Sequence, residues 1–126
     1  MAKEWTGSPQ YRQDTRLTVG EARILTIGVT NDAGVDLTGA TARYVVVRDP
    51  MAPPPALIEK TSPSQIAITV PPSGPYQLQL QVQLVDSDTN ALAPGWYHHE
   101  TTLQLANGAP ITVMEGEFRL DPSQEW

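Results

Sequence analysis

Histidine and acidic side chains are the groups in this chain that could support acid–base or metal chemistry, and they are sparse. The sequence has two histidines, the neighbours His98 and His99, and no cysteine. Neighbouring side chains on a β-strand point to opposite faces, so without a bulge the two imidazoles cannot serve one metal ion or one substrate. We therefore interpret His99 as a residue at the edge of the core and His98 as solvent-facing, and we expect no zinc site.

The sequence also lacks the usual arrangements for nucleophilic catalysis. A serine nucleophile requires a histidine that is oriented by a carboxylate, and the motif G-x-S-x-G does not occur. No other grouping of acid, base and nucleophile is apparent. The sequence therefore predicts a protein that is not an enzyme, with no catalytic residues, no cofactor, no metal and no small-molecule substrate.

A short acidic segment offers a calcium alternative. Asp86, Asp88 and Asn90 alternate as oxygen ligands could, but the segment lacks the glycine and the distal glutamate of an EF-hand loop. The same residue types also cap short helical turns by hydrogen bonding to nearby backbone groups. We favour a short helical turn that leads into Leu92.

The clearest periodicity in the chain lies between residues 76 and 84, where apolar residues alternate with Gln77, Gln79, Gln81 and Gln83. Such alternation predicts a strand with one core face and one amide face. No charged residue occurs from Thr61 to Val85, although exposed strands are usually protected by lysine or glutamate. The amide face is therefore either covered by another subunit, which involves no desolvation of ions, or the solvated face of a central strand paired on both sides.

Isolated aromatic residues near the ends of the chain are further candidates for an interface. Trp5, Tyr11 and Trp126 stand in polar segments, and tryptophan frequently anchors interfaces. Alternatively, each terminal tryptophan folds back on its own domain. Trp96 is exposed by strand parity and is another candidate, unless it packs beside Pro94.

The elements that must position these residues are β-strands. Leu92, Gly95 and Tyr97 have the spacing of a tyrosine corner, in which the tyrosine hydroxyl hydrogen-bonds a backbone group just upstream at the end of a β-sandwich. Gly95 permits the sharp backbone, and Tyr97 buries its ring while its hydroxyl keeps a partner. Alternating patterns predict strands at 16–30, 40–48, 56–60, 65–70, 76–84, 96–105 and 111–120.

These patterns predict an all-β protein: a single immunoglobulin-like β-sandwich of about seven antiparallel strands with extended terminal arms. The expected organisation is an N-terminal arm at 1–14, the sandwich at 15–120 and a C-terminal tail at 121–126. The proline-rich stretch 49–55 cannot form a central strand, and Asn107-Gly108 predicts a hairpin turn.

Composition excludes several classes of partner. The 126 residues carry a net charge of −6, and the eight basic residues are scattered, so we expect neither nucleic acid nor an anionic membrane as partner. No apolar run is long enough for a membrane span, and the polar start of the sequence does not resemble a secretory signal. The absence of cysteine suits folding in a reducing cytosol.

Four short motifs occur in the same order as in a family of phage proteins. They are R-x-D-T at 12–15, D-L-T-G-A at 36–40, D-T-x-x-L-x-x-G-x-Y at 88–97 and G-x-F at 116–118. In the second motif, Asp36 lies in an acidic turn and Gly39 permits a tight entry into the next strand. This ordered set resembles immunoglobulin-like structural proteins of tailed bacteriophages and prophages, of the baseplate upper protein or fibre-attachment type.

The resemblance implies a non-enzymatic virion structural protein that is made in the host cytoplasm, is not secreted, and contacts other virion proteins or its own copies. The sequence has no coiled-coil or receptor-binding region, unlike the longer members, which favours an adaptor, connector or decoration subunit in the tail, baseplate or capsid. The alternative is an extracellular carbohydrate-binding or adhesion module. Its ligand would stack on Trp96 or Tyr76 and hydrogen-bond the glutamine face.

Overall fold

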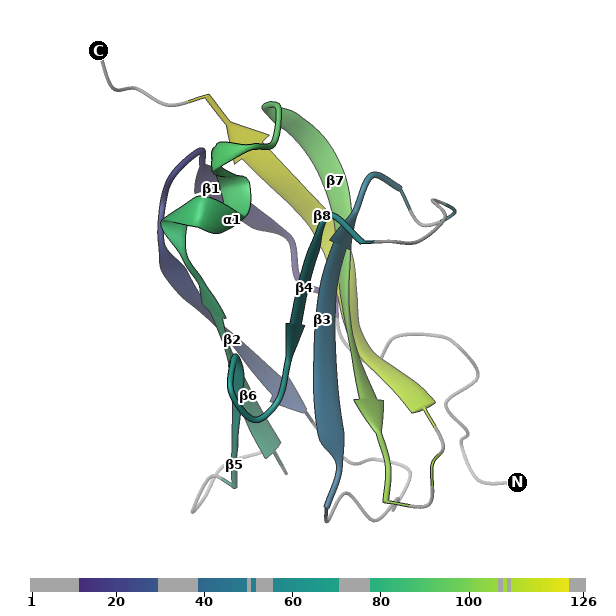
Figure 1. Ribbon diagram of the computed structural model, residues 1–126. Helices are drawn as coiled ribbons and strands as arrows, with labels where there is room; N and C mark the ends of the chain where they lie inside the picture. The colour runs from purple at the N-terminus through teal and green to yellow at the C-terminus, as the bar shows by residue number, and fades with distance from the viewer. Residues whose placement is uncertain are drawn as a thin grey trace.

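The computed structural model describes residues 12–29, 39–49, 51, 56–70, 78–106, 108 and 110–122. Within them, eight strands form two sheets that face each other, and a short helix lies across one end (Figure 1). The elements are β1 (Thr15–Thr18), β2 (Arg23–Val29), β3 (Thr41–Val47), β4 (Ile58–Thr61), β5 (Ile66–Thr69), β6 (Leu78–Leu84), α1 (Asp86–Asn90), β7 (Gly95–Gln104) and β8 (Pro110–Asp121). The predicted all-β sandwich is confirmed.

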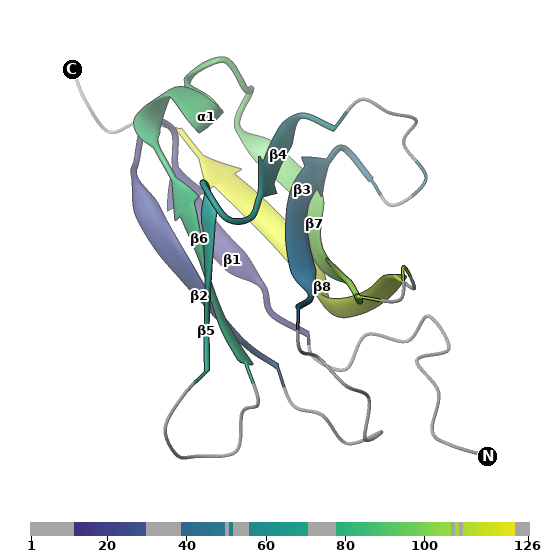
Figure 2. The ribbon, with the colours of Figure 1, turned by 60° about the horizontal axis from the view of Figure 1, so that its bottom comes forward.

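The strand order is that of an immunoglobulin-like sandwich. One sheet has the order β1-β8-β7-β3-β4 and the other has the order β2-β6-β5, and the two layers are seen obliquely in Figure 2. In immunoglobulin terms, β3, β7 and β8 correspond to strands C, F and G, and β2, β6 and β5 correspond to B, E and D. The second predicted strand, β3, is central in its sheet as expected, because it pairs with both β4 and β7.

One pairing differs from the all-antiparallel prediction. The single strand expected at 16–30 is two strands, because a turn at Val19 and Gly20 interrupts it, and Gly20 has a φ of 86°. Before the turn, β1 pairs with β8 in parallel, and after it β2 pairs with β6 in the opposite sheet. The chain thus changes sheets where the sequence pattern suggests one continuous strand.

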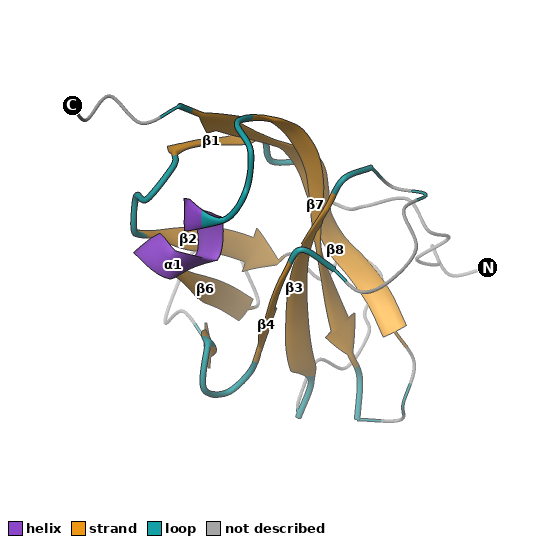
Figure 3. Cartoon of the chain, turned by 45° about the horizontal axis from the view of Figure 1, so that its top comes forward, coloured by secondary structure: helices purple, strands orange, loops and turns teal. Residues whose placement is uncertain are grey.

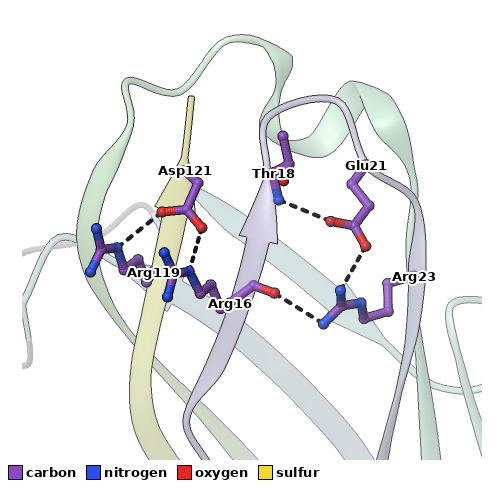
Figure 4. Close-up of polar contacts among 6 residues, drawn as sticks. All are labelled: Arg16, Thr18, Glu21, Arg23, Arg119 and Asp121. Atoms are coloured by element: carbon purple, nitrogen blue, oxygen red, sulfur yellow. Dashed lines mark hydrogen bonds and ion pairs between the residues drawn. The ribbon is translucent and has the colours of Figure 1, made fainter. Parts of the chain in front are cut away.

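Contacts of charged side chains fix the segment between β1 and β2, where the chain passes from one sheet to the other (Figure 4). The Arg16 guanidinium on β1 donates to the Asp121 carboxylate at the end of β8, and it lowers the pKa of that carboxyl. Beyond the turn, Glu21 accepts hydrogen bonds from the Thr18 N–H at 2.9 Å and from Arg23 at 2.7 Å. Arg23 also donates to the Arg16 carbonyl at 3.0 Å, so the start of β2 is tied back to β1.

The core consists of the inward-facing residues of both sheets. The alternation predicted for the glutamine-containing strand is confirmed, since Leu78, Leu80, Val82 and Leu84 are buried. From the other sheet, the largest buried side chains include Tyr44 and Phe118. Burial of these apolar groups between the sheets is the main stabilising contribution.

The acidic segment forms the short helix α1, the one helix in the described part of the chain (Figure 3), which confirms the predicted helical turn. The Asp88 carboxylate accepts the Val85 N–H at 2.7 Å and lies 2.8 Å from Lys60 Nζ of β4. Lys60 is buried, so this ion pair joins the end of β6 to the edge of the opposite sheet. The Thr89 hydroxyl accepts the Gly20 N–H at 2.8 Å, which fixes the turn between β1 and β2.

The tyrosine corner is also confirmed. The Tyr97 hydroxyl donates to the Ala93 carbonyl, and Leu92 packs against the core. Gly95 has a φ of 152°, in the region that favours glycine. Gly39, with a φ of 78°, provides the turn into β3, and Asp36 lies outside the described residues.

Residues 12–14, which the sequence pattern places in the N-terminal arm, run beside β8. The Gln13 N–H donates to the Glu115 carbonyl at 3.0 Å, and the Asp14 carboxylate accepts the Glu117 N–H at 2.9 Å. A β-carbon at Gly116 would lie 2.1 Å from the Gln13 carbonyl oxygen, so this approach requires glycine. Trp5, Tyr11 and Trp126 lie outside the described residues.

Candidate interaction surface

The outer side of the three-stranded sheet is an uncharged surface, which we call the amide face. It consists of the outward residues of β2, β6 and β5, namely Ile24, Thr26, Gly28, Gln79, Gln81, Gln83, Ala67 and Thr69. Gln81 and Gln83 are exposed and Gln79 is half-buried, whereas Gln77 lies outside the described residues. The glutamines predicted as one face therefore extend into a surface that spans three strands.

The strand register places residues of β2 and β5 beside the glutamines of β6. Gln81 lies between Thr26 of β2 and Ala67 of β5, and Ile24, which is 58% exposed, lies opposite Gln83. The alternation in β2 shows from the sequence that Ile24 and Thr26 share one face of that strand. Only the pairing of β2 with β6 shows that this face is the same one that carries the glutamines. The alternative, in which the glutamines form the solvated face of a central strand, requires that β6 is paired on both sides, and it is.

The free edge of β2 continues the amide face. β2 pairs with β6 on one side and, within the described residues, with no strand on the other. From Ile24 to Val29 it carries no charge and no proline, which are the features that usually protect an edge strand from pairing with another chain. In the described part of the chain, the sheet thus presents an uncharged face beside an edge that no strand or charge protects from Ile24 to Val29.

The outer side of the five-stranded sheet has the opposite character. It carries Arg43 on β3, Glu100 on β7 and Glu115, Glu117 and Arg119 on β8. Arg43 pairs with Glu59 of the neighbouring strand at 2.7 Å. Charged groups on this sheet are therefore close enough to interact with one another, whereas the amide face has none.

Trp96 belongs to this charged side. It is 58% exposed, as strand parity predicted, and the Arg119 guanidinium lies over its ring at 4.7 Å from the centroid. Trp96 and the glutamines project from opposite outer faces of the sandwich, so one small sugar could not stack on Trp96 and hydrogen-bond the glutamine face at the same time. Tyr76, the other stacking candidate, lies outside the described residues.

The two histidines point to opposite sides of β7, as predicted. His99 is fully buried, with Nε2 at 2.7 Å from the Gln13 carbonyl oxygen and Nδ1 at 2.9 Å from the Tyr44 hydroxyl. Since a carbonyl oxygen only accepts, Nε2 carries the proton and Nδ1 accepts from Tyr44. Burial lowers the pKa of His99, which favours this neutral form. His99 is thus a structural residue deeper in the core than expected.

His98 was expected to face solvent, but its side chain is only 14% exposed and lies among carboxylates. Its Nε2 is 3.3 Å from Glu100 Oε1 and 3.9 Å from Glu115 Oε1. A groove of about 440 Å³ runs beside this cluster and is lined in part by Arg12, Trp96 and His98. Sequence reasoning did not find the cluster, because Glu115 reaches it from the neighbouring strand.

No protein family model matches the chain, and no curated protein matches it significantly. Among solved structures, the crystal structure of CopC from Methylosinus trichosporium OB3b is similar, with 12% sequence identity and a TM-score of 0.42. The match covers 90% of this chain and 88% of CopC, and a TM-score this low carries no argument about function. Among the described residues, no helix is long and apolar enough to cross a membrane.

Proposed function

We propose that this protein is a non-enzymatic structural subunit of a tailed-phage virion, an adaptor, connector or decoration protein that assembles through its amide face. The observation that supports this most is the concentration of uncharged, exposed side chains on one sheet of an otherwise acidic chain. The net charge is −6, yet the outward residues of β2, β6 and β5 carry none of it. The order of the sequence motifs supplies the virion context.

The occupant of the amide face that fits its chemistry best is a second copy of this chain. Each glutamine side chain both donates and accepts hydrogen bonds, so a row of glutamines can pair with the same row related by a two-fold axis. Two acidic chains repel each other, and the repulsion is smallest where they meet through an uncharged surface. The unprotected edge of β2 adds backbone groups for the same contact.

The test is the concentration dependence of the mass of the purified full chain, measured by light scattering. We expect a defined oligomer for the wild type and a shift towards monomer for Gln81→Lys, which would place two like charges in a two-fold contact. Gln104→Lys is the matched control, because Gln104 is an exposed glutamine on the other sheet. Hydrogen exchange should show protection of the β2 backbone in the oligomer.

Two results would refute assembly of this kind. One is a wild-type protein that remains monomeric at high concentration and whose mass and terminal exchange do not change when it is mixed with virion proteins. The other is an oligomer that Gln81→Lys and Gln104→Lys affect equally, since the contact would then lie elsewhere than on the amide face. Glycan binding that disappears in Trp96→Ala would instead support the carbohydrate-binding alternative.

A further inference from the structure

We propose that His98, Glu100 and Glu115 form a binding site for a divalent transition-metal ion, with Zn²⁺ as the representative ligand. The site lies on the outer side of the five-stranded sheet, on the face of the sandwich opposite the amide face. It is independent of the proposed assembly, because it uses none of the residues of the amide face.

The strand register gathers the three ligands. His98 and Glu100 are two residues apart on β7 and so project from the same side, and Glu115 lies directly opposite Glu100 on β8. One ligand atom from each residue lies within 4.8 Å of the other two. Ligand atoms around a tetrahedral Zn²⁺ are about 3.4 Å apart, given metal–ligand distances of about 2.1 Å. The separation between His98 Nε2 and Glu100 Oε1 is already 3.3 Å, so small side-chain rotations would complete the set.

The charges around the cluster favour a cation. Glu100 and Glu115 face each other across β7 and β8, an arrangement of like charges that destabilises a sheet. Glu117, opposite His98, adds a third carboxylate. Two cations line the groove, Arg12 and Arg48. Arg12 lies 3.1 Å from Asp14 and is neutralised in part by it, and the Arg48 guanidinium lies over the Tyr97 ring. A bound divalent ion would relieve the repulsion between the two glutamates.

The ligand types select the class of metal. His98 is the single imidazole available for coordination, because both nitrogens of His99 are engaged by Gln13 and Tyr44. One imidazole with two carboxylates suits Zn²⁺ and neighbouring transition metals, whereas Mg²⁺ and Ca²⁺ prefer oxygen ligands alone. The groove beside Glu115 leaves room for water to complete the coordination.

The test is calorimetric titration of the full chain with Zn²⁺ at neutral pH in a buffer that does not bind metal. We expect one ion per chain and at least a tenfold loss of affinity in Glu100→Gln, Glu115→Gln and His98→Asn. The matched control is Glu117→Gln, which removes the same charge from the same patch and should change affinity by less than about threefold, because only screened long-range attraction is lost. Millimolar Mg²⁺ should not compete.

A second readout separates coordination from general attraction to an acidic surface. In NMR spectra, Zn²⁺ should shift the ring resonances of His98 and leave those of His99 unchanged. The proposal is overturned if no binding is measured up to about 1 mM Zn²⁺, a range well above that of specific sites. It is equally overturned if Glu117→Gln weakens binding as much as Glu115→Gln, or if the variants fold and bind as the wild type does.

Discussion

The two outer faces of this sandwich differ in charge: the outward residues of one sheet are uncharged, and those of the other include several charged side chains. Within the described residues, the amide face has no ionised group and β2 has no strand beyond its outer edge, whereas the five-stranded sheet carries glutamates, arginines and a largely buried histidine on its outer side. Charges keep strands soluble and prevent unwanted pairing, so their absence from the outward positions of one sheet in an acidic chain needs a reason. Contact with another chain on the amide face and ion chemistry on the other face would give the two sheets separate tasks.

The largest expected effect comes from breaking the ion pair that joins the two sheets. Asp88→Asn removes the charge that compensates buried Lys60 while keeping an oxygen for the Val85 N–H. We expect a loss of about 3 kcal/mol in the free energy of unfolding, because an uncompensated charge remains buried. Chemical denaturation measures it. Asp86→Asn is the matched control, since Asp86 is exposed in the same helix and should change stability by less than about 0.5 kcal/mol.

A loss of comparable size in Asp86→Asn would mean that α1 depends on its overall charge rather than on the pairing with Lys60. Equal stability of Asp88→Asn and the wild type would show that the two sheets, and with them the two outer faces, are held together without this contact. Either result would mean that the ion pair between Lys60 and Asp88 does not hold the two sheets together.

An intermediate effect concerns the inner side of β7, directly behind the charged face. Burial lowers the pKa of His99 below 6.5, so the unfolded chain binds more protons than the folded one between the two pKa values. The stabilising contribution is complete above pH 6.5 and is lost as the pH falls through that value towards the folded pKa. Denaturation at a series of pH values should show this slope in the wild type and in His98→Asn.

In His99→Gln the slope just below pH 6.5 should disappear, because the titrating group is gone, whereas the loss at more acidic pH that follows from carboxylates such as Asp121 should remain. A slope that persists in His99→Gln and vanishes in His98→Asn would assign the pH dependence to the outer, carboxylate-rich side of β7 instead. The pair of variants therefore distinguishes the core side of this strand from its charged side.

Local signals allowed much of the fold to be predicted from the sequence. The alternation around Leu80, the corner formed by Leu92, Gly95 and Tyr97, and the helical turn at Asp88 each depend on residues close together in the chain, and each is confirmed. The parallel pairing of β1 was missed because it depends on where the chain changes sheets. Only Gly20 marks that point in the sequence, and an isolated glycine in a strand pattern has several explanations.

The candidate sites were harder to predict because they depend on register. Glu100 meets Glu115 only because of the length of the hairpin and the irregularity in register between Thr101 and Thr102. Likewise, the need for glycine at position 116 follows from the approach of Gln13, which is distant in sequence. The glutamine stripe itself was visible, since it lies on a single strand, but its extent over three strands was not.

The smallest expected effect tests whether Glu100 and Glu115 repel each other across β7 and β8. Without added metal, Glu115→Gln should raise the free energy of unfolding by about 0.5 kcal/mol, because it removes a like charge directly across from Glu100. Glu59→Gln removes the same charge on the same sheet but breaks a 2.7 Å ion pair with Arg43, so it should leave stability unchanged or slightly lower. High salt should shrink the gain in Glu115→Gln, since Glu100 and Glu115 are both partly exposed. A gain of equal size in both variants would indicate that net charge alone matters, and the charged face would then have no special arrangement for a cation to relieve.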